Sequence, residues 1–303
     1  MFVLGIDGGG SSTVARLADY AGNSIKTVQV GEINSTMMNK DDWIQSCSSI
    51  LNHFESYVDR IQCIFIGLSG ISRLKIETIE FLKEDLKKRI HPDAEVFIVN
   101  DAVLGLYAGT GGEDGIVNIA GTGSQTFGLK NGVEFKIGGW GHKFDHTGSG
   151  YGIAIEGIKS VITAYENRSP FNYFEKAVMD AWGEDSFMEM MEKINSGSSA
   201  KQIAQLSKTI CALATEDEQA RRIIDRAAHD ISDAITRMSE AHFAGEKGVK
   251  VILMGGLMNQ QDLFLPLLEK KLPHALLKVL DQEPVEGAVI AGLKAVKGSE
   301  NGD

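Results

Sequence analysis

The sequence predicts an α/β protein of two domains that open on the same motif. Near the start, an apolar run at 2–6 ends in an acid, three glycines and three hydroxyl residues, and a second short run follows at 14–18. The same order of strand, glycine-rich turn and strand recurs from Ile116. After the first copy, strand and helix patterns alternate, which is typical of a sheet covered by helices. A chain of 303 residues is long enough for two such domains.

The first glycine-rich turn reads as the tip of a hairpin. The run Phe2 to Ile6 is long enough for a buried strand, and Asp7 ends it. Consecutive glycines remove every Cβ from the bend, so another group can approach the backbone closely. Adjacent backbone N–H groups bind anions such as phosphate, and a carboxylate suits Mg²⁺ directly or through water. The alternative is a plain glycine hairpin with a solvated acid.

Further strand and helix patterns complete the first domain. Asn34 lies in a polar loop, either as a turn residue or as a ligand for sugar hydroxyls, since its amide both donates and accepts. Asp101 follows a strand, at the point where a parallel sheet delivers residues to a cleft. Its alternative role is to cap the next helix. The predicted strands cover 24–30, 61–68 and 96–99, and the predicted helices cover about 41–57, 76–89 and 102–107.

The glycine-rich stretch 109–115 marks a domain boundary. We therefore expect a first domain over 1–114 and a second over 115–284 with a helical insertion, while a closing helix at about 285–297 packs back on the first. The recurrence of the opening hairpin favours a functional reading of both copies, because two facing hairpins can hold one polyphosphate. The predicted strands of the second domain cover 116–120, 125–129, 133–137, 250–254 and 276–279, and its main helices cover about 149–165, 216–242 and 261–271.

A glycine-rich stretch at 138–152 follows the second hairpin and reads as a shaped loop that accepts a ligand at close range. It surrounds Trp140 with small residues. His142, Asp145 and His146 have a spacing that could grip a metal on a helix, but the flanking glycines argue against a helix there. We expect a role in a substrate loop or in the structure instead.

Composition and missing motifs exclude several classes of protein. The formal charge of −11 argues against a nucleic-acid surface, and no segment reaches the apolar length of a membrane span. The N-terminus has no signal pattern, and the three scattered cysteines fit a reducing compartment, which we expect to be the cytoplasm. No complete G-x-G-x-x-G opens a helix after a first strand, and no phosphate-binding P-loop motif is present.

Five short motifs occur in an order that carries a family resemblance. They are Gly5-Ile6-Asp7-Gly8-Gly9-Gly10, Asn100-Asp101-Ala102, Gly121-Thr122-Gly123-Ser124, Gly138-Gly139-Trp140-Gly141-His142 and Gly255-Gly256. In this order they resemble the N-acetylglucosamine kinases of the BadF/BadG/BcrA/BcrD-type ATPase family, within the superfamily of sugar kinases, actin and heat-shock chaperones. The resemblance covers nearly the whole chain. It implies two ribonuclease-H-like, actin-like ATPase domains that flank an ATP cleft, each with a mixed five-stranded sheet.

The resemblance also implies roles for individual residues. Asp101 would be the catalytic base that takes the proton from the attacking hydroxyl, which is that of carbon 6 of an amino sugar. Asp7 would lie near Mg²⁺. A homodimer is compatible with the resemblance but is not implied by it. The residues implied for ATP are Gly8, Gly9, Gly10, Ser11, Ser12, Thr13, Gly121, Thr122, Gly123, Ser124, Gly255 and Gly256. The residues implied for the sugar are Asn34, Asp101, Gly139, Trp140, Asp145 and His146.

One departure leaves the identity of the sugar open. Where the family commonly reads Gly-Asp-Glu-Gly-Ser, this chain has Asp145-His146-Thr147-Gly148-Ser149. His146 stands at the place of the family's sugar-contacting Asp. Either Asp145 reaches the sugar from a shifted loop, or the preference has changed among N-acetylglucosamine, N-acetylmuramic acid and glucosamine.

Two other function classes remain as alternatives. One is an ATPase without a sugar substrate, like the BadF/BadG activators, whose cluster-binding cysteines the three separated cysteines here do not match. The other is a sugar sensor without catalysis, against which the retained Asp7 and Asp101 argue.

Overall fold

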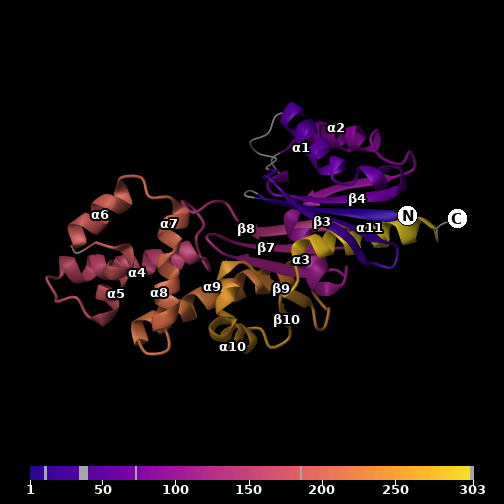
Figure 1. Cartoon of the computed structure of the whole chain (residues 1–303). Coiled ribbons are helices and arrows are strands. Elements are labelled where there is room, and N and C mark those ends of the chain that lie inside the picture. Colours follow the sequence, from indigo (N-terminus) through magenta and orange to yellow (C-terminus); the bar gives the residue numbers. More distant parts are fainter. Residues whose placement is uncertain (10–11, 34–39, 72–73, 185, 301–303) are drawn as a thin grey trace. The chain divides into compact units, whose positions relative to one another are not determined.

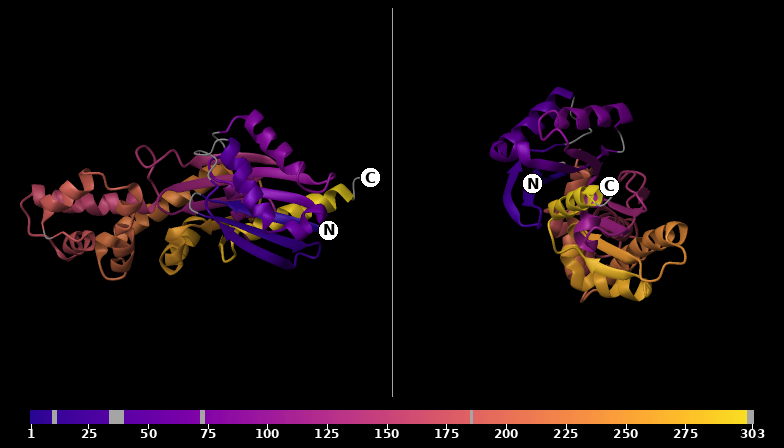
Figure 2. Two further views of the ribbon diagram at one scale, coloured as in Figure 1. Left: turned by 45° about the horizontal axis from the view of Figure 1, so that its top comes forward. Right: turned by 90° about the vertical axis from the view of Figure 1, so that its right-hand side faces the viewer.

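The computed structural model describes residues 1–9, 12–33, 40–71, 74–184 and 186–300. Within it, the chain forms two compact units, of which unit 1 comprises residues 1–114 with the chain from 280 onward, and unit 2 comprises 115–279. Each unit contains one five-stranded sheet with helices (Figure 1 and Figure 2). The predicted α/β class, with a mixed five-stranded sheet in each half, is therefore confirmed.

The sheet of unit 1 has the strand order β3-β2-β1-β4-β5. Its antiparallel part is β1 (Phe2–Gly8), β2 (Thr13–Asp19) and β3 (Ser24–Val30). β4 (Ile61–Leu68) and β5 (Glu95–Asn100) lie parallel to β1. Short apolar runs that end in glycine or polar residues form these strands, as the sequence predicts. The carboxyl ends of β1, β4 and β5 consequently meet at one edge.

The helices of unit 1 differ from the prediction at one place. The helix expected over 41–57 ends at Asn52, and a 3₁₀ helix follows. His53 and Phe54 donate their N–H groups to carbonyls three residues back, which tightens the turn and lets the fully buried Phe54 enter the core. The helical elements are α1 (Lys40–Asn52), η1 (Glu55–Arg60), α2 (Ile76–Lys87), α3 (Asp101–Thr110) and α11 (Pro284–Glu300).

Helix α11, from the end of the chain, packs against β1 and α3 at very short range. A Cβ on Gly287 would lie 1.9 Å from the carbonyl oxygen of Leu104 in α3, and one on Gly5 would lie 2.9 Å from the backbone nitrogen of Val289. These two glycines therefore let backbone meet backbone.

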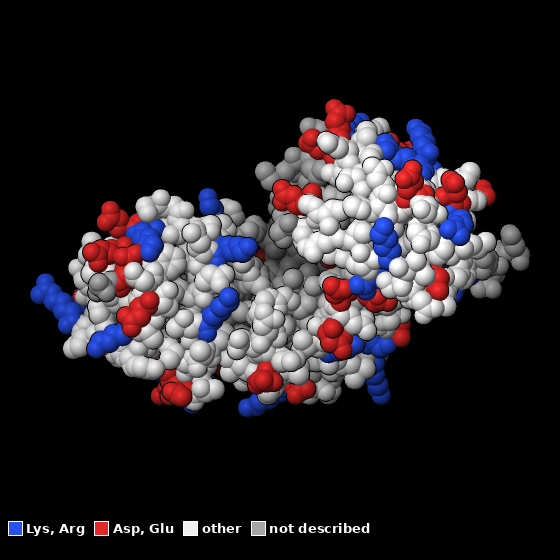
Figure 3. Space-filling view, in the orientation of Figure 1, with Lys and Arg blue, Asp and Glu red and all other residues white. Residues whose placement is uncertain are grey.

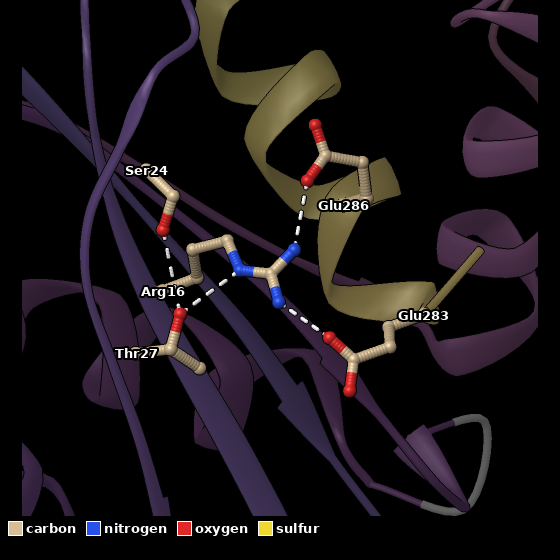
Figure 4. A network of polar contacts seen from close by, with 5 residues as sticks. All are labelled: Arg16, Ser24, Thr27, Glu283 and Glu286. Carbon is tan, nitrogen blue, oxygen red and sulfur yellow. Dashed lines mark hydrogen bonds and ion pairs between the residues drawn. The ribbon is translucent and has the colours of Figure 1, made fainter.

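An arginine fastens the start of α11 to the sheet (Figure 4). The guanidinium of Arg16, on β2, donates to Glu286 at 2.9 Å, to Glu283, and to the hydroxyl of Thr27 at 3.1 Å. The Arg16 side chain is only 17% exposed, so this network is shielded more than a surface ion pair. The chain is held just after it re-enters unit 1.

The sheet of unit 2 has the strand order β10-β9-β6-β7-β8. The hairpins join β6 (Gly115–Ala120), β7 (Ser124–Lys130) and β8 (Val133–Gly138) in antiparallel pairs. β9 (Lys250–Met254) and β10 (Leu276–Val279) run parallel to β6 and to each other. The second sheet thus repeats the antiparallel opening of the first.

From Gly150 to His242 most of the chain between β8 and β9 is helical. Helix α9 spans Glu218–His242 and buries an apolar stripe that includes Ile224, Ile231 and Ile235. The remaining helices of unit 2 are α4 (Gly150–Glu166), α5 (Tyr173–Trp182), α6 (Phe187–Asn195), α7 (Ala200–Ala204), α8 (Leu206–Leu213), the 3₁₀ helix η3 (Gly256–Gln260) and α10 (Gln261–Lys271).

None of the helices that the structure describes has the length and apolar character needed to cross a membrane. Cys47, Cys63 and Cys211 are free and buried. Burial raises the pKa of Cys63 to about 12 and that of Cys211 to about 11, so neither thiol is reactive near neutral pH.

The contact between α11 and α3 generates a test of the fold. We expect Gly287→Ala to lower the free energy of unfolding by about 2–4 kcal/mol, because the added methyl cannot fit against α3. Gly298→Ala is the matched control in the same helix, since a Cβ there meets nothing within 4 Å. Urea unfolding of both variants measures the difference, and equal midpoints would contradict the close packing.

Candidate active site

Two acids lie at the carboxyl edge of the unit 1 sheet. Asp7 is aligned with Gly67 of β4 and, through it, with Val99 of β5. One residue later β5 ends, and Asp101 begins α3. The strand between the two acids carries no side chain at Gly67.

Gly67 allows the start of α3 to lie directly on β4. A Cβ at this position would stand 3.1 Å from the Cα of Asp101 and 2.6 Å from the methyl groups of Leu104. Any other residue would push α3 away. The sequence indicates this only as a lone glycine in an apolar strand, which is a common mark of close approach.

Asn100 caps α3, and Asp101 is the first residue inside the helix. The side-chain oxygen of Asn100 accepts the N–H of Ala102 at 2.9 Å. The alternative prediction that Asp101 is the N-cap is therefore wrong. Asn and Asp are about equally good caps, so the sequence could not decide between these neighbours.

The two carboxyl groups are partly withdrawn from water and sense each other. Burial, and then the charge of Asp101, raise the pKa of Asp7 to about 6. Burial also raises the pKa of Asp101, opposed by backbone N–H groups at the start of α3. Among the described residues, neither acid has an ion-pair partner. Such a pair could bind a divalent cation, or one of its carboxylates could accept a proton.

The turn after Asp7 is described only in part, because Gly10 and Ser11 lie outside the described residues. Gly9 donates its N–H to the carbonyl of Ser12 at 3.2 Å, which closes the turn. A Cβ on Gly8 would stand 2.6 Å from Leu68. Asn34 also lies outside the described residues.

The second glycine turn, in unit 2, is anchored through its carbonyl groups. The N–H groups of Gly150 and Tyr151, at the start of α4, donate to the carbonyls of Gly121 and Thr122 at 2.7 and 3.1 Å. Ser149 caps the helix. In the part of the chain that the structure describes, the N–H groups of Thr122 and Gly123 donate to no protein oxygen. The turn therefore offers donors for an anion.

Gly255 and Gly256 lie beside this turn. Gly255 has φ +100°, and a Cβ there would stand 2.5 Å from the carbonyl oxygen of Ala120. Gly256 has nothing within 4 Å of the Cβ position, and its nitrogen is 3.6 Å from the Cβ position of Gly121. β9 thus delivers open backbone next to the second turn, where a flat ring could lie.

The loop after β8 presents Trp140 to solvent on an ordered turn. Trp140 is 72% exposed, and the Lys136 ammonium lies 4.8 Å from its ring centre. The N–H groups of Phe144 and Asp145 donate to Gly141, and the Asp145 carboxylate accepts the Trp140 N–H at 3.4 Å. Gly139 lies against the side chain of Gln125. The sequence analysis did not identify Gln125 as a candidate site residue.

Asp145 and His146 line different hollows of unit 2. The hollow at Asp145 measures about 280 Å³ and includes Ser124, at the end of the second turn, and Arg237 of α9. The hollow at His146 measures about 290 Å³, and Arg226 of α9 is among the residues that line it. His146 has a buried ring nitrogen without a partner among the described residues and lies near Tyr151, which sequence reasoning also missed.

The described residues contain no metal-binding group of three or more His, Cys, Asp or Glu side chains. His142, Asp145 and His146 therefore do not assemble as a metal site. On the described face drawn in Figure 3, positive and negative side chains are interspersed, and neither sign forms a broad patch.

The sequence matches the model of one protein family over nearly its whole length. The model of the BadF/BadG/BcrA/BcrD ATPase family matches residues 4–294. The chain belongs to this family. Use of ATP follows from that membership.

Characterised relatives of the chain are amino-sugar kinases. An N-acetylmuramic acid/N-acetylglucosamine kinase of Clostridium acetobutylicum is 27% identical over 300 residues, which cover 95% of this chain and 97% of the relative. An N-acetyl-D-glucosamine kinase of Dictyostelium discoideum is 25% identical, with 97% and 98% covered.

Solved structures share the fold. A protein from Chromobacterium violaceum, reported as an N-acetylglucosamine kinase, matches with a TM-score of 0.71 at 22% identity, over 96% of this chain and 98% of that one. A ROK hexokinase from Thermus thermophilus matches with a TM-score of 0.59 at 15% identity, over 98% and 100%. The predicted actin-like class of fold is confirmed by these likenesses.

The raised pKa of Asp7 generates a stability prediction. Its pKa is about 6 in the folded protein against an ordinary 3.8. The folded state therefore binds more protons than the unfolded chain between these values, and its stability falls as pH rises through this window. We expect Asp7→Asn to be more stable than the parent at pH 7.5, by up to about 3 kcal/mol, and to match it at pH 3.5.

Thermal unfolding without nucleotide or metal, at both pH values, measures this effect. Asp93→Asn is the matched control, because the Asp93 side chain is 87% exposed and lies in the same unit. A parent that is as stable as Asp7→Asn at pH 7.5 would show that the burial of Asp7 carries no energetic cost.

Proposed function

We propose that this chain is an ATP-dependent amino-sugar kinase that phosphorylates N-acetylglucosamine or a related sugar. The observation that carries the proposal is the pair of partly buried acids at the edge of the unit 1 sheet, one of which, Asp101, is relieved of capping by Asn100. Membership of the family supports ATP as the nucleotide, and the names of the relatives support an amino sugar as the substrate.

In this proposal, bare backbone contacts ATP. The turn from Gly121 to Ser124 would offer the N–H groups of Thr122 and Gly123 to phosphate oxygens. The turn from Gly8 to Thr13 would meet the phosphates as well, and Gly255 with Gly256 would lie by the adenosine. N–H donors suit this chain because its net charge of −11 would otherwise repel a polyphosphate.

The acid pair fits a divalent cation. Both carboxyl groups have a raised pKa, that of Asp7 partly through the charge of Asp101, and neither has an ion-pair partner among the described residues, so a bound cation would compensate them. We propose that Asp7 holds Mg²⁺, directly or through water. The bound ion would neutralise charge on the phosphate oxygens during transfer.

Asp101 would act as the general base. The hydroxyl oxygen of the sugar attacks the terminal phosphorus of ATP, the bond from that phosphorus to ADP breaks, and the hydroxyl proton passes to the Asp101 carboxylate. Phosphoryl transfer has a loose transition state, so positioning supplies most of the catalysis. A base adds about 10²–10⁴-fold.

The sugar would contact Asn34, Gly139 and Trp140, with its 6-hydroxyl toward Asp101. Trp140 offers an exposed aromatic face on an ordered turn. Asp145 shares a hollow with Ser124, which favours a carboxylate that reaches the site from a shifted loop. His146 lines a separate hollow, so we place it beside the sugar site only as a secondary contact.

Two alternatives are kept as outcomes of the test. An activator-type ATPase would need cluster-binding cysteines, and the three cysteines here are buried and free. A silent sugar sensor would have no use for the raised pKa of Asp7 and Asp101. The cytoplasmic location and a homodimer stay predictions.

An ADP-release assay with Mg²⁺ and a panel of amino sugars tests the proposal. We expect ADP release that depends on N-acetylglucosamine, N-acetylmuramic acid or glucosamine, with phosphate on the 6-hydroxyl. Hydrolysis that ignores the sugar would support the activator reading. Sugar binding without any ADP release would support the sensor.

Asp101→Asn tests the base. We expect kcat to fall by at least about 100-fold with KM for both substrates nearly unchanged, because the amide cannot accept the proton. The fold should persist, since the carboxyl group has a raised pKa and gains nothing from ionisation. Asp93→Asn is the control, and a near-parental kcat in Asp101→Asn would remove Asp101 from the base role.

A further inference from the structure

The hollow at Asp145 is the first of three that follow one another along helix α9. It has Asp230 in its wall in common with the neighbouring hollow at His146. A third hollow, of about 490 Å³, has Glu156 and Arg226 in common with the one at His146. Hollows that share wall residues lie side by side, and we call the three together the α9 groove.

The α9 groove lies within unit 2, where helix α4 packs against helix α9. Its wall on α9 extends from Gln219 to Arg237, and a helix of that length spans about 27 Å. Its lining includes the buried apolar side chains of Ile153 and Ala227. The groove is therefore longer than one sugar ring, and at Ser124 it reaches the second glycine turn.

The charged side chains of the groove neutralise one another. Arg222 pairs with Glu218, which lies outside the groove, and the Asp145 carboxylate accepts the Trp140 N–H. The other charged residues of the lining form three ion pairs, Lys159–Glu156 at 2.7 Å, Arg226–Asp230 at 3.3 Å and Arg237–Asp233 at 3.0 Å. In a chain with a net charge of −11, the lining of this groove has as many cations as acids.

Paired charges of this kind favour a neutral ligand that is rich in hydroxyl groups. A hydroxyl group both donates and accepts hydrogen bonds, and a carboxylate beside a cation offers an acceptor and a donor together. An anion would be attracted by the cations and repelled equally by the acids, so it would gain little. The apolar part of the lining suits the carbon–hydrogen faces of sugar rings.

We propose that the α9 groove binds further sugar units of a short, β-linked N-acetylglucosamine oligosaccharide whose end unit is phosphorylated. The inference rests on the proposed function, in which Trp140 and Asp145 contact the unit that is phosphorylated. The second unit would lie in the hollow at Asp145, and the third would lie farther along α9, beside Glu156. The linkages leave the 6-hydroxyl of each unit free, so its oxygen attacks the terminal phosphorus of ATP and ADP leaves, as in the proposed function.

Kinase assays with N-acetylglucosamine and with its β-linked disaccharide and trisaccharide test the proposal. We expect KM to fall by at least about fivefold from the monosaccharide to the trisaccharide, because each further unit forms hydrogen bonds in the groove. The value of kcat should change by less than about threefold, since the reacting groups are the same. An active parent whose KM does not fall with chain length, or that rejects the oligosaccharides, would overturn the proposal.

Two variants test the order of the units in the groove. We expect Arg237→Ala to raise KM for the disaccharide and the trisaccharide by about 3- to 10-fold, and Glu156→Ala to raise it for the trisaccharide alone. KM for the monosaccharide should stay parental in both. Both side chains are about half exposed and form surface ion pairs, so their removal should leave the fold intact.

Glu166→Ala is the matched control for Glu156→Ala. Glu166 is also an exposed acid of helix α4, but it lines none of the three hollows. We expect this variant to keep the parental KM for all three sugars. A trisaccharide KM that none of the three variants changes would place the further units elsewhere and overturn the proposal.

The outcomes separate this inference from the proposed function. A parent protein that releases no ADP with any sugar contradicts the kinase, and calorimetric titration without ATP then still tests the groove. Tighter binding of the trisaccharide than of the monosaccharide, weakened in Glu156→Ala, would support the groove. A parent that phosphorylates the monosaccharide but binds the trisaccharide no more tightly would leave the kinase standing and overturn the groove.

Discussion

The carboxyl edge of the unit 1 sheet holds two partly buried acids, Asp7 and Asp101, and the charge of Asp101 contributes to the raised pKa of Asp7. Like charges near each other in a protein repel by several times the value found in water, so the pair opposes folding at neutral pH. Asp7 cannot move away, because its strand is hydrogen-bonded on both sides, and Asp101 cannot, because Gly67 brings the start of α3 onto the sheet. The fold therefore stores an unfavourable charge pair that a cation would relieve.

The energy that holds this pair comes from packing elsewhere in unit 1. Helix α3 packs against both the sheet and α11, and the contact at Gly287 brings the two helix backbones together. Fully buried residues such as Leu104 and Ala288 fill this contact, and Arg16 fastens the start of α11 through Glu286.

The sequence predicts most of the strands and helices because residues close to their ends mark where they stop. Apolar runs such as Ile61–Leu68 and Lys250–Met254 have a glycine within two residues of their end, and their bounds agree with the structure. The prediction fails where two local solutions have similar energies. Asn100 and Asp101 are about equally favourable caps, and in the structure Asn100 takes this place. The end of α1 similarly depends on Phe54, which prefers the core to another helical turn.

The two hairpins are copies in sequence pattern but not in charge. Asp7 is the second-last residue of β1 that pairs with β2, and the equivalent residue of β6 is Ile119. Only the first copy therefore brings an acid to its turn. The second copy turns its carbonyls toward the start of α4, which leaves N–H groups outward. A metal-bound polyphosphate needs both kinds of partner, an acid for the cation and N–H donors for the oxygens. Under the proposed function, the acid would come from the first copy and the N–H donors from the second.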